Sequence, residues 1–238
     1  MRFEIYLESG PQRKKTWVYV PDLPGCSTVA PTSDAAIEAA RVAIGQRLEF
    51  LRRHGDDIPG AEPIEIVVVD HSVDSKFLGY GQGAFPSDRE ALTAEEAARQ
   101  LSWATWSRAE LVAAARAQTV PATMPPPAGG RSAASILSHV AGSEWAYVSS
   151  NLGTLKGGSA AIAAIERAGD EPWEALAAER EALMERLRRM TLDELVIVTE
   201  RGEGKPPKSA RRMLRRLLEH EWEHVLELNS RLPGGSTQ

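Results

Sequence analysis

The sequence predicts an α+β module, ordered strand–strand–helix–strand, followed by an all-α four-helix bundle. Two observations support this fold class. In roughly the first seventy residues, strand-like runs surround a single helical segment, whereas beyond residue 90 nearly every run has the three- and four-residue apolar spacing of an amphipathic helix. We therefore expect the module over residues 1–72, a linker over residues 73–89 and the bundle over residues 90–234.

The composition is that of an ordinary folded protein and excludes several classes. Hydrophobic residues make up 42% and charged residues 26% of the 238 residues, which excludes wholesale disorder. The net charge of −5 disfavours a dedicated nucleic-acid binder. No run of about 18 apolar residues is present, so we expect no membrane span. The single cysteine, Cys26, and a first segment without the apolar core of a signal peptide favour a cytoplasmic location.

Three strands and one helix are expected in the first module. Residues 3–8 alternate between apolar and polar, and residues 16–20 favour strands, so the break between them predicts a hairpin. Ser33 is a suitable N-cap for a helix with one apolar face, and Gly55 is a natural end for it. Residues 64–69 form a β-branched run that is apolar enough to be a central strand.

The second half carries a helix start signal before each long apolar stripe. Glycines and polar residues before Asp88 favour a linker, and Thr93 with Glu96 then forms a capping box. Further helices are expected from Ser132 to Ser150, from Ser159 to Arg167, from Asp170 to about Met190 and from Ser209 to about Ser230. Four long amphipathic helices joined by loops predict a four-helix bundle.

Two histidines, His220 and His224, lie four residues apart in the last predicted helix. Side chains at this spacing stand one above the other, so their imidazoles can bind one metal ion. On a helical wheel the pair falls beside the apolar stripe of Met213, Leu217 and Leu228, so it faces the bundle rather than open water. The alternative is a pair of histidines on a polar helix without any ligand role.

The same run matches the H-E-x-x-H pattern of zinc peptidases, but the residues after it lack the third ligand that those enzymes use. The metzincin spacing would place a third histidine where this chain has Ser230. The residues after His224 are also too few for the helix that brings a distant glutamate in other peptidases. A peptidase is therefore disfavoured.

A third histidine, His139, lies upstream in the second predicted helix. It is the remaining histidine of the helical half, and its neighbours Ile136 and Val140 allow it to lie near the core. A core histidine bonded to a neighbour is the alternative. Three histidines that leave a coordination position open are typical of a catalytic metal site rather than a closed structural one.

These residues resemble a known family. The run Ser-His-Val-Ala-Gly-Ser-Glu-Trp at residues 138–145, together with residues 211–224, is similar to the DinB/YfiT superfamily of metal-binding four-helix bundles, over about residues 90–234. The resemblance implies that His139, His220 and His224 bind Zn²⁺, Ni²⁺ or another divalent ion. Characterised relatives include thiol S-transferases that use low-molecular-weight thiols and a maleylpyruvate isomerase, and bundles of this kind commonly form homodimers.

The first module carries a resemblance of its own. Residues 18–26, which end in Asp-Leu-Pro-Gly-Cys, and residues 31–36 are similar to the partial RNase-H-like domain of HicB antitoxins. In that family the domain binds a toxin ribonuclease and a C-terminal module binds DNA. The helical half replaces the DNA-binding module in this chain, so neither repressor function nor toxin binding carries over. Cys26 is expected to be a small buried turn residue rather than a nucleophile.

The sequence thus predicts a divalent-metal-dependent enzyme of the thiol S-transferase or hydrolase type acting on a small molecule. Glu221 lies nearer the apolar side of the last helix than Glu223 and is the candidate for a supporting residue or general base. The alternative is a non-catalytic binding or regulatory protein that uses the HicB-like module to bind a protein partner. No specific nucleic-acid binding is expected, because the basic run from Arg211 to Arg216 falls on the solvated side of the helix, paired in part with Glu219.

Overall fold

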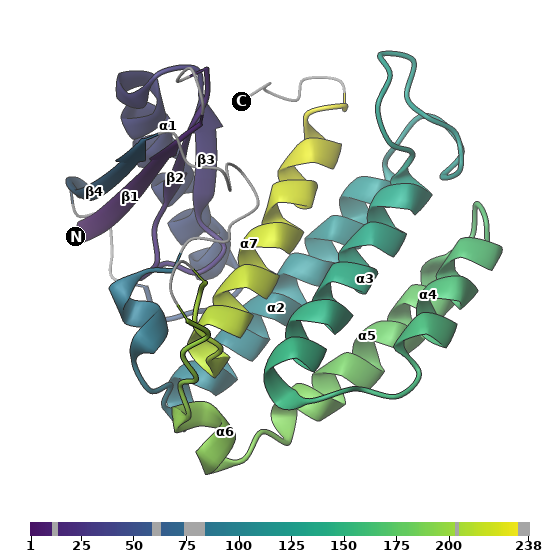
Figure 1. The fold of residues 1–238 in the computed structure, drawn as a ribbon. Coiled ribbons are helices and arrows are strands. Elements are labelled where there is room, and N and C mark those ends of the chain that lie inside the picture. Colours follow the sequence, from purple (N-terminus) through teal and green to yellow (C-terminus); the bar gives the residue numbers. More distant parts are fainter. Residues whose placement is uncertain (11–13, 59–62, 74–83, 203–204, 233–238) are drawn as a thin grey trace.

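A small sheet with one long helix lies against a set of helices that run alongside one another (Figure 1). The computed structural model describes residues 1–10, 14–58, 63–73, 84–202 and 205–232. The last helix, α7 (Ala210–Asn229), lies between the sheet module and the rest of the helices. This position lets α7 carry side chains toward both halves of the molecule.

The sheet has four strands in the order β3-β2-β1-β4. β1 (Arg2–Ser9) and β2 (Thr16–Tyr19) form the predicted hairpin, and β3 (Ser27–Ala30) pairs antiparallel with β2. β4 (Glu65–Val73) pairs parallel with β1, which requires a crossover, and the helix α1 (Ser33–Arg53) lies within that crossover. The expected strand–strand–helix–strand order therefore gains one strand, β3.

The prediction that residues 64–69 form a central strand is wrong. β4 lies at the edge of the described sheet, and Val68 and Val69 are 43% and 46% exposed. β-branched residues fit any pleated strand, so their presence indicates a strand without indicating its place in the sheet. The short strand β3 is the other edge strand, so β1 and β2 are the central pair.

The turn before β3 is fixed by its glycine and by a buried arginine. Gly25 has a φ of +87°, and a Cβ at this position would lie 2.5 Å from the guanidinium of Arg47. Arg47 donates a hydrogen bond to the Pro24 carbonyl at 3.0 Å and another to the Ser107 hydroxyl of the helical half at 3.3 Å. The Asp-Leu-Pro-Gly-Cys run thus lies where the two halves meet. Cys26 is buried as expected, and burial raises the pKa of its thiol to about 12.

The helices begin close to the expected caps, with two differences. Thr32 rather than Ser33 caps α1, and Pro172 rather than Asp170 precedes α5, because the Asp170 carboxylate accepts hydrogen bonds from Thr123. The Thr93–Glu96 capping box is present at α2. The helices of the second half are α2 (Ala94–Arg116), α3 (Ala133–Leu152), α4 (Gly158–Arg167), α5 (Trp173–Arg188), the short α6 (Leu192–Val196) and α7.

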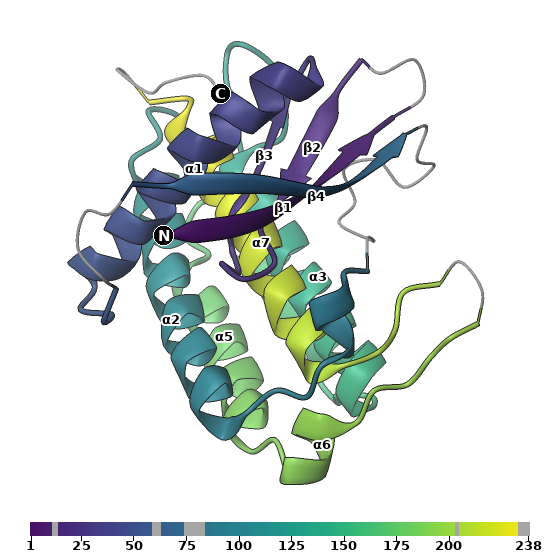
Figure 2. The same ribbon diagram turned by 90° about the vertical axis from the view of Figure 1, so that its left-hand side faces the viewer.

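The predicted helical second half is confirmed. The short helix expected from Ser159 to Arg167 is α4, and the short α6 was not predicted. α7 packs on α2 and α3, and α5 contacts both α2 and α3 (Figure 2). α4 lies on the outside against α3 and α5. None of the described helices is long and apolar enough to cross a membrane.

One hydrophobic core extends through both halves. It joins Ile5, Ile44 and Leu51 of the sheet module to Leu214 and Leu218 of α7. Part of the predicted linker also packs here: Phe85 lies 4.8 Å from Tyr6 and 5.4 Å from Tyr19 between ring centroids. The stretch 74–83 of that linker lies outside the described residues. The domain boundaries predicted at residues 72 and 90 stay predictions, and so does the HicB-like character of the first module.

Candidate metal centre

The two histidines of α7 are buried on the side of the helix that faces α3. Ser209 caps α7 by accepting a hydrogen bond from the backbone N–H of Arg212 at 3.2 Å. One and two helical turns beyond the apolar Leu217, His220 and His224 are only 8% and 6% exposed. The i, i+4 spacing therefore sets both imidazoles in one column, as expected from the sequence.

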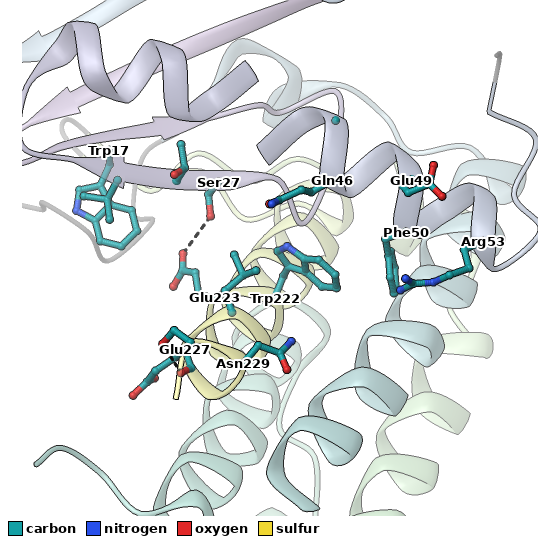
Figure 3. Close-up of a pocket in the computed structure, with 15 residues that line it drawn as sticks. Trp17, Ser27, Gln46, Glu49, Phe50, Arg53, Trp222, Glu223, Glu227 and Asn229 are labelled. Atoms are coloured by element: carbon teal, nitrogen blue, oxygen red, sulfur yellow. Dashed lines mark hydrogen bonds between the residues drawn. The ribbon is translucent and has the colours of Figure 1, made fainter. Parts of the chain in front are cut away.

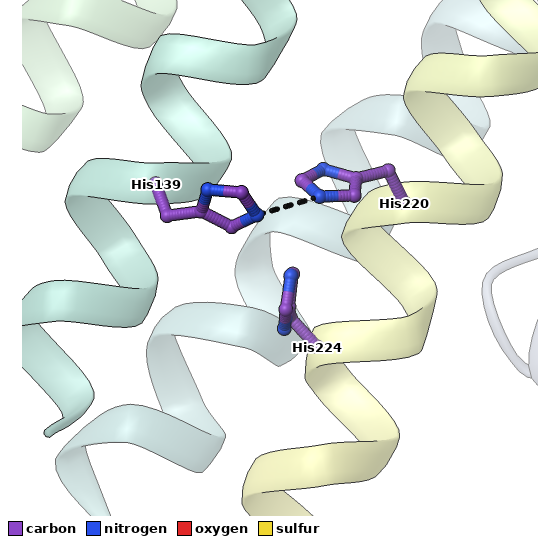
Figure 4. Close-up of side chains that lie close together, drawn as sticks. All are labelled: His139, His220 and His224. Atoms are coloured by element: carbon purple, nitrogen blue, oxygen red, sulfur yellow. Dashed lines mark hydrogen bonds between the residues drawn. The ribbon is translucent and has the colours of Figure 1, made fainter. Parts of the chain in front are cut away.

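His139 of α3 completes a cluster of three imidazoles (Figure 4). Its Nε2 lies 3.1 Å from Nε2 of His220, and the ring centroid of His139 lies 4.9 Å from that of His220 and 5.3 Å from that of His224. One ligand nitrogen from each of the three residues lies within 4.8 Å of the other two. His139 is exposed rather than near the core, so solvent reaches the cluster from its side.

Electrostatics favours the neutral form of two of these imidazoles, His139 and His220. Burial, reinforced by His224, Arg216 and His139, lowers the pKa of His220 to about 2. Burial and the proximity of His224 also lower the pKa of His139. A neutral imidazole has a free nitrogen lone pair, which is the form that binds a metal ion.

The distance between two of the ligand nitrogens, those of His139 and His220, fits a shared divalent ion. Zinc–nitrogen bonds of about 2.0–2.1 Å at tetrahedral angles separate two ligand nitrogens by about 3.3 Å, close to the observed 3.1 Å between His139 and His220. The Nδ1 of His220 is buried and has no hydrogen-bond partner among the described residues.

A glutamate that the sequence analysis did not single out supports the cluster. Oε2 of Glu227 lies 2.7 Å from Nδ1 of His224. Partial burial would raise the pKa of Glu227. The opposing effects are larger: the hydrogen bond from His224 and the charges of His224, Arg131 and Arg231 lower this pKa to about 2. An ionised carboxylate only accepts hydrogen bonds, so Nδ1 of His224 is the donor in this pair, and Nε2 is the ring nitrogen left to bind a metal ion. Glu227 follows His224 by three residues, and this i, i+3 spacing is the sequence signal from which their contact could have been predicted.

Glu221 points to a neighbouring side of α7, into an ion-pair network with α2, α3 and α5. Its carboxylate accepts hydrogen bonds from Arg108 at 2.5 Å and from Arg180 at 3.3 Å. The same two arginines pair with Glu144. Burial raises the pKa of Glu221, and Arg180 and Arg108 oppose that effect. A base role for Glu221 stays a prediction, and the contacts that this structure shows are those of a fully buried, paired carboxylate.

The predicted solvated face of Arg211–Arg216 is wrong for two of its members. Arg215 and Arg216 are only 1% and 3% exposed. Arg215 pairs with Asp88 and Glu219, and Arg216 also pairs with Glu219. The helical wheel predicted that these arginines face solvent. In the structure, Phe85 and Asp88 of the segment before α2 cover Arg215, and Tyr147 of α3 lies against Arg216. Long side chains with charged partners can be buried in this way.

The fold and the histidine cluster together define a helical bundle with a three-histidine candidate metal centre. Residues 90–228 match the sequence profile of the DinB superfamily, and this matched stretch is more than half of the 238 residues. The chain therefore belongs to the DinB superfamily, whose members typically bind metal ions. No curated protein and no solved structure gives a significant match.

Proposed function

We propose that this protein is a divalent-metal-dependent enzyme of the thiol S-transferase or hydrolase type, with His139, His220 and His224 as the metal ligands. The observation that carries the proposal is the convergence of three imidazoles from two helices, with one ligand nitrogen of each lying within 4.8 Å of the others and with the pKa of His139 and of His220 lowered. A Zn²⁺ or Ni²⁺ ion bound there would act as a Lewis acid and lower the pKa of a bound water or low-molecular-weight thiol.

The residues of the chain prepare the site in three ways. His220 and His224 come from one helix and His139 from another, so the ligands connect α7 to α3. Glu227 fixes the orientation and tautomer of His224. The exposed side of His139 borders a hollow of about 440 Å³ lined by Ser135, Ser138 and Glu166, where a small polar substrate can approach the open side of the cluster.

Paired assays test this proposal. The protein is loaded with Zn²⁺ or Ni²⁺, and two rates are measured: displacement of chloride from monochlorobimane by cysteine or glutathione, and hydrolysis of an activated ester. We expect at least one rate to depend on both the metal and His220, with His220→Ala reduced to the metal-free background. A chain that binds metal but accelerates neither reaction would favour the non-catalytic binding or regulatory protein.

A homodimer and a cytoplasmic location are part of the same proposal. The superfamily resemblance supports the first, and the composition supports the second. Sedimentation of the purified protein at several concentrations tests the first, since a dimer must dissociate on dilution or sediment at twice the chain mass.

A further inference from the structure

A cavity of about 800 Å³ lies between the sheet module and α7 (Figure 3). Strands β2 and β3 and helix α1 form one wall, and the last two turns of α7 form the other. The volume lies in the range of small-molecule sites, which commonly occur where two domains meet. The three histidines do not line this cavity, so it is separate from the open side of the metal centre.

The walls of the cavity combine aromatic rings with carboxylates. In Figure 3, Trp17 of β2 lies at the left and Trp222 of α7 near the centre of the view, with Glu223 between them. Faces of tryptophan rings attract cations, because the ring quadrupole places negative potential above the plane. The lining thus offers apolar surface together with negative potential.

The charged groups of the lining are not equally free to bind a ligand. Arg53 pairs with Glu110 at 3.0 Å, and Glu49 pairs with Arg52 at 3.2 Å. Glu227 is held by His224 and two arginines. The positive charge of the lining is therefore already compensated, and so are two of its three carboxylates.

Glu223 is the exception. Its carboxylate is partly buried, and the one hydrogen bond that it makes within the described residues is accepted from the Ser27 hydroxyl at 3.4 Å. It forms no ion pair with any described residue, although Glu221 two residues before it is paired with two arginines. A partly buried carboxylate with one long hydrogen bond retains unused acceptor capacity in a confined space, which a cationic donor would satisfy.

From this arrangement we infer that the cavity is a binding site for a small organic cation, an ammonium group attached to an apolar or aromatic body. The ammonium donates to Glu223, and the apolar body lies against Trp222 and Phe50 or Trp17. An anionic ligand would face three carboxylates. The site requires no metal ion and is independent of the proposed enzymatic function.

The test uses three probes of one shape: 2-phenylethylammonium, its neutral analogue 2-phenylethanol and the anion 3-phenylpropanoate. Each is titrated at pH 7 into ¹⁵N-labelled protein, with Zn²⁺ and separately with chelator, while the indole N–H signals are followed. Trp17→Phe and Trp222→Phe assign those two signals. We expect saturable shifts of the Trp17 and Trp222 signals with the cation, and binding about tenfold or more weaker for the other two probes, as for a hydrogen bond to a charged group.

Two variants assign the binding to the cavity. Glu223→Gln should weaken binding of 2-phenylethylammonium about tenfold, whereas Glu181→Gln, which removes an equal charge from an exposed pair on α5, should leave it unchanged. Gln46→Lys adds an ammonium to an exposed position of the lining and should block the cation. Val42→Lys, one turn earlier on α1 and 59% exposed outside the lining, should not.

Equal binding of the alcohol and the cation would overturn the inference, as would preference for the anion. The absence of any shift of the Trp17 and Trp222 signals with the cation at millimolar concentration would overturn it as well. So would unchanged binding in both Glu223→Gln and Gln46→Lys. Because the chelator arm contains no bound metal, failure here is distinguishable from failure of the proposed metal centre.

Discussion

The two polar sides of α7 use buried polar residues in opposite ways. Toward α2 and α5, Glu221 lies between two arginines, and the charges compensate one another within the protein. Toward α3, His220 and His224 present ligand nitrogens to a third histidine, and the Nδ1 of His220 has no partner among the described residues. The first arrangement stabilises the fold, while the second is suited to a ligand from outside. Burial alone does not separate them, since His220, His224 and Glu221 are all buried. Charge pairing does, because Glu221 has two arginine partners and His220 has no oppositely charged partner among the described residues.

The largest expected effect on stability comes from removing one arginine of the ion-pair network around Glu221. Arg108→Met leaves Glu144, Glu179 and Glu221 to share a single cation, Arg180. Removing one partner from a buried ion-pair network costs about 3–5 kcal/mol, because the remaining charges stay desolvated. We expect a loss of this size in the free energy of unfolding, measured by urea denaturation. The control is Arg188→Met, whose exposed pair with Glu181 is expected to contribute less than about 1 kcal/mol. Equal losses in the two variants would refute the structural role of the network.

A smaller effect is expected from the side that faces α3. Glu227→Gln removes the ionised acceptor that fixes the His224 tautomer, so the affinity for Zn²⁺ should fall about 10- to 100-fold. Competition with a chelating dye measures this affinity. Glu200→Gln, which loses an exposed pair with Arg89, is the matched control and should bind Zn²⁺ like the parent. An unchanged affinity in Glu227→Gln would show that Glu227 does not orient the ligand.

The smallest effect concerns pH. The network holds three carboxylates against two arginines, and burial, reinforced by repulsion from Glu144, raises the pKa of Glu179 to about 7. A native carboxyl whose pKa exceeds its unfolded value of about 4.3 binds more protons than the unfolded chain, so its contribution is fully present below that value and is lost as the pH rises through 7. We expect the parent to lose on the order of 1 kcal/mol relative to Glu179→Gln between about pH 4.5 and 7, measured by urea denaturation at each pH. If the parent instead gained stability relative to Glu179→Gln over that pH interval, the predicted direction would be contradicted.

Much of the fold can be predicted from local patterns, and the exceptions have physical reasons. Thr93 with Glu96 and the caps Ser132 and Ser209 predict their helices, because capping is a local interaction. The place of β4 in the sheet is not local, since it depends on where β3 pairs. β3 itself is a four-residue strand after a glycine turn, too short for an alternating pattern to be read.

The candidate site divides in the same way. The i, i+4 pair on α7 and the third histidine of the helical half could be predicted from spacing, and the cluster confirms that they converge. The burial of Arg215 could not be predicted, because its partner Asp88 is 127 residues away in the chain. The cavity beside Glu223 could not be predicted either, because one wall comes from residues 17–53 and the other from residues 222–230, which are far apart in the sequence.

Metal stoichiometry tests the central claim most directly. The purified protein is incubated with Zn²⁺ or Ni²⁺, desalted and analysed by elemental mass spectrometry, in parallel with the His139→Ala, His220→Ala and His224→Ala variants. His54→Ala and His71→Ala, which alter histidines outside the cluster, serve as controls. We predict one ion per chain for the parent and both controls, none for the three cluster variants, and a melting temperature that rises with metal only where the ion binds. A parent that retains neither ion, or a His220→Ala variant that retains as much as the parent, would contradict the three-histidine metal centre.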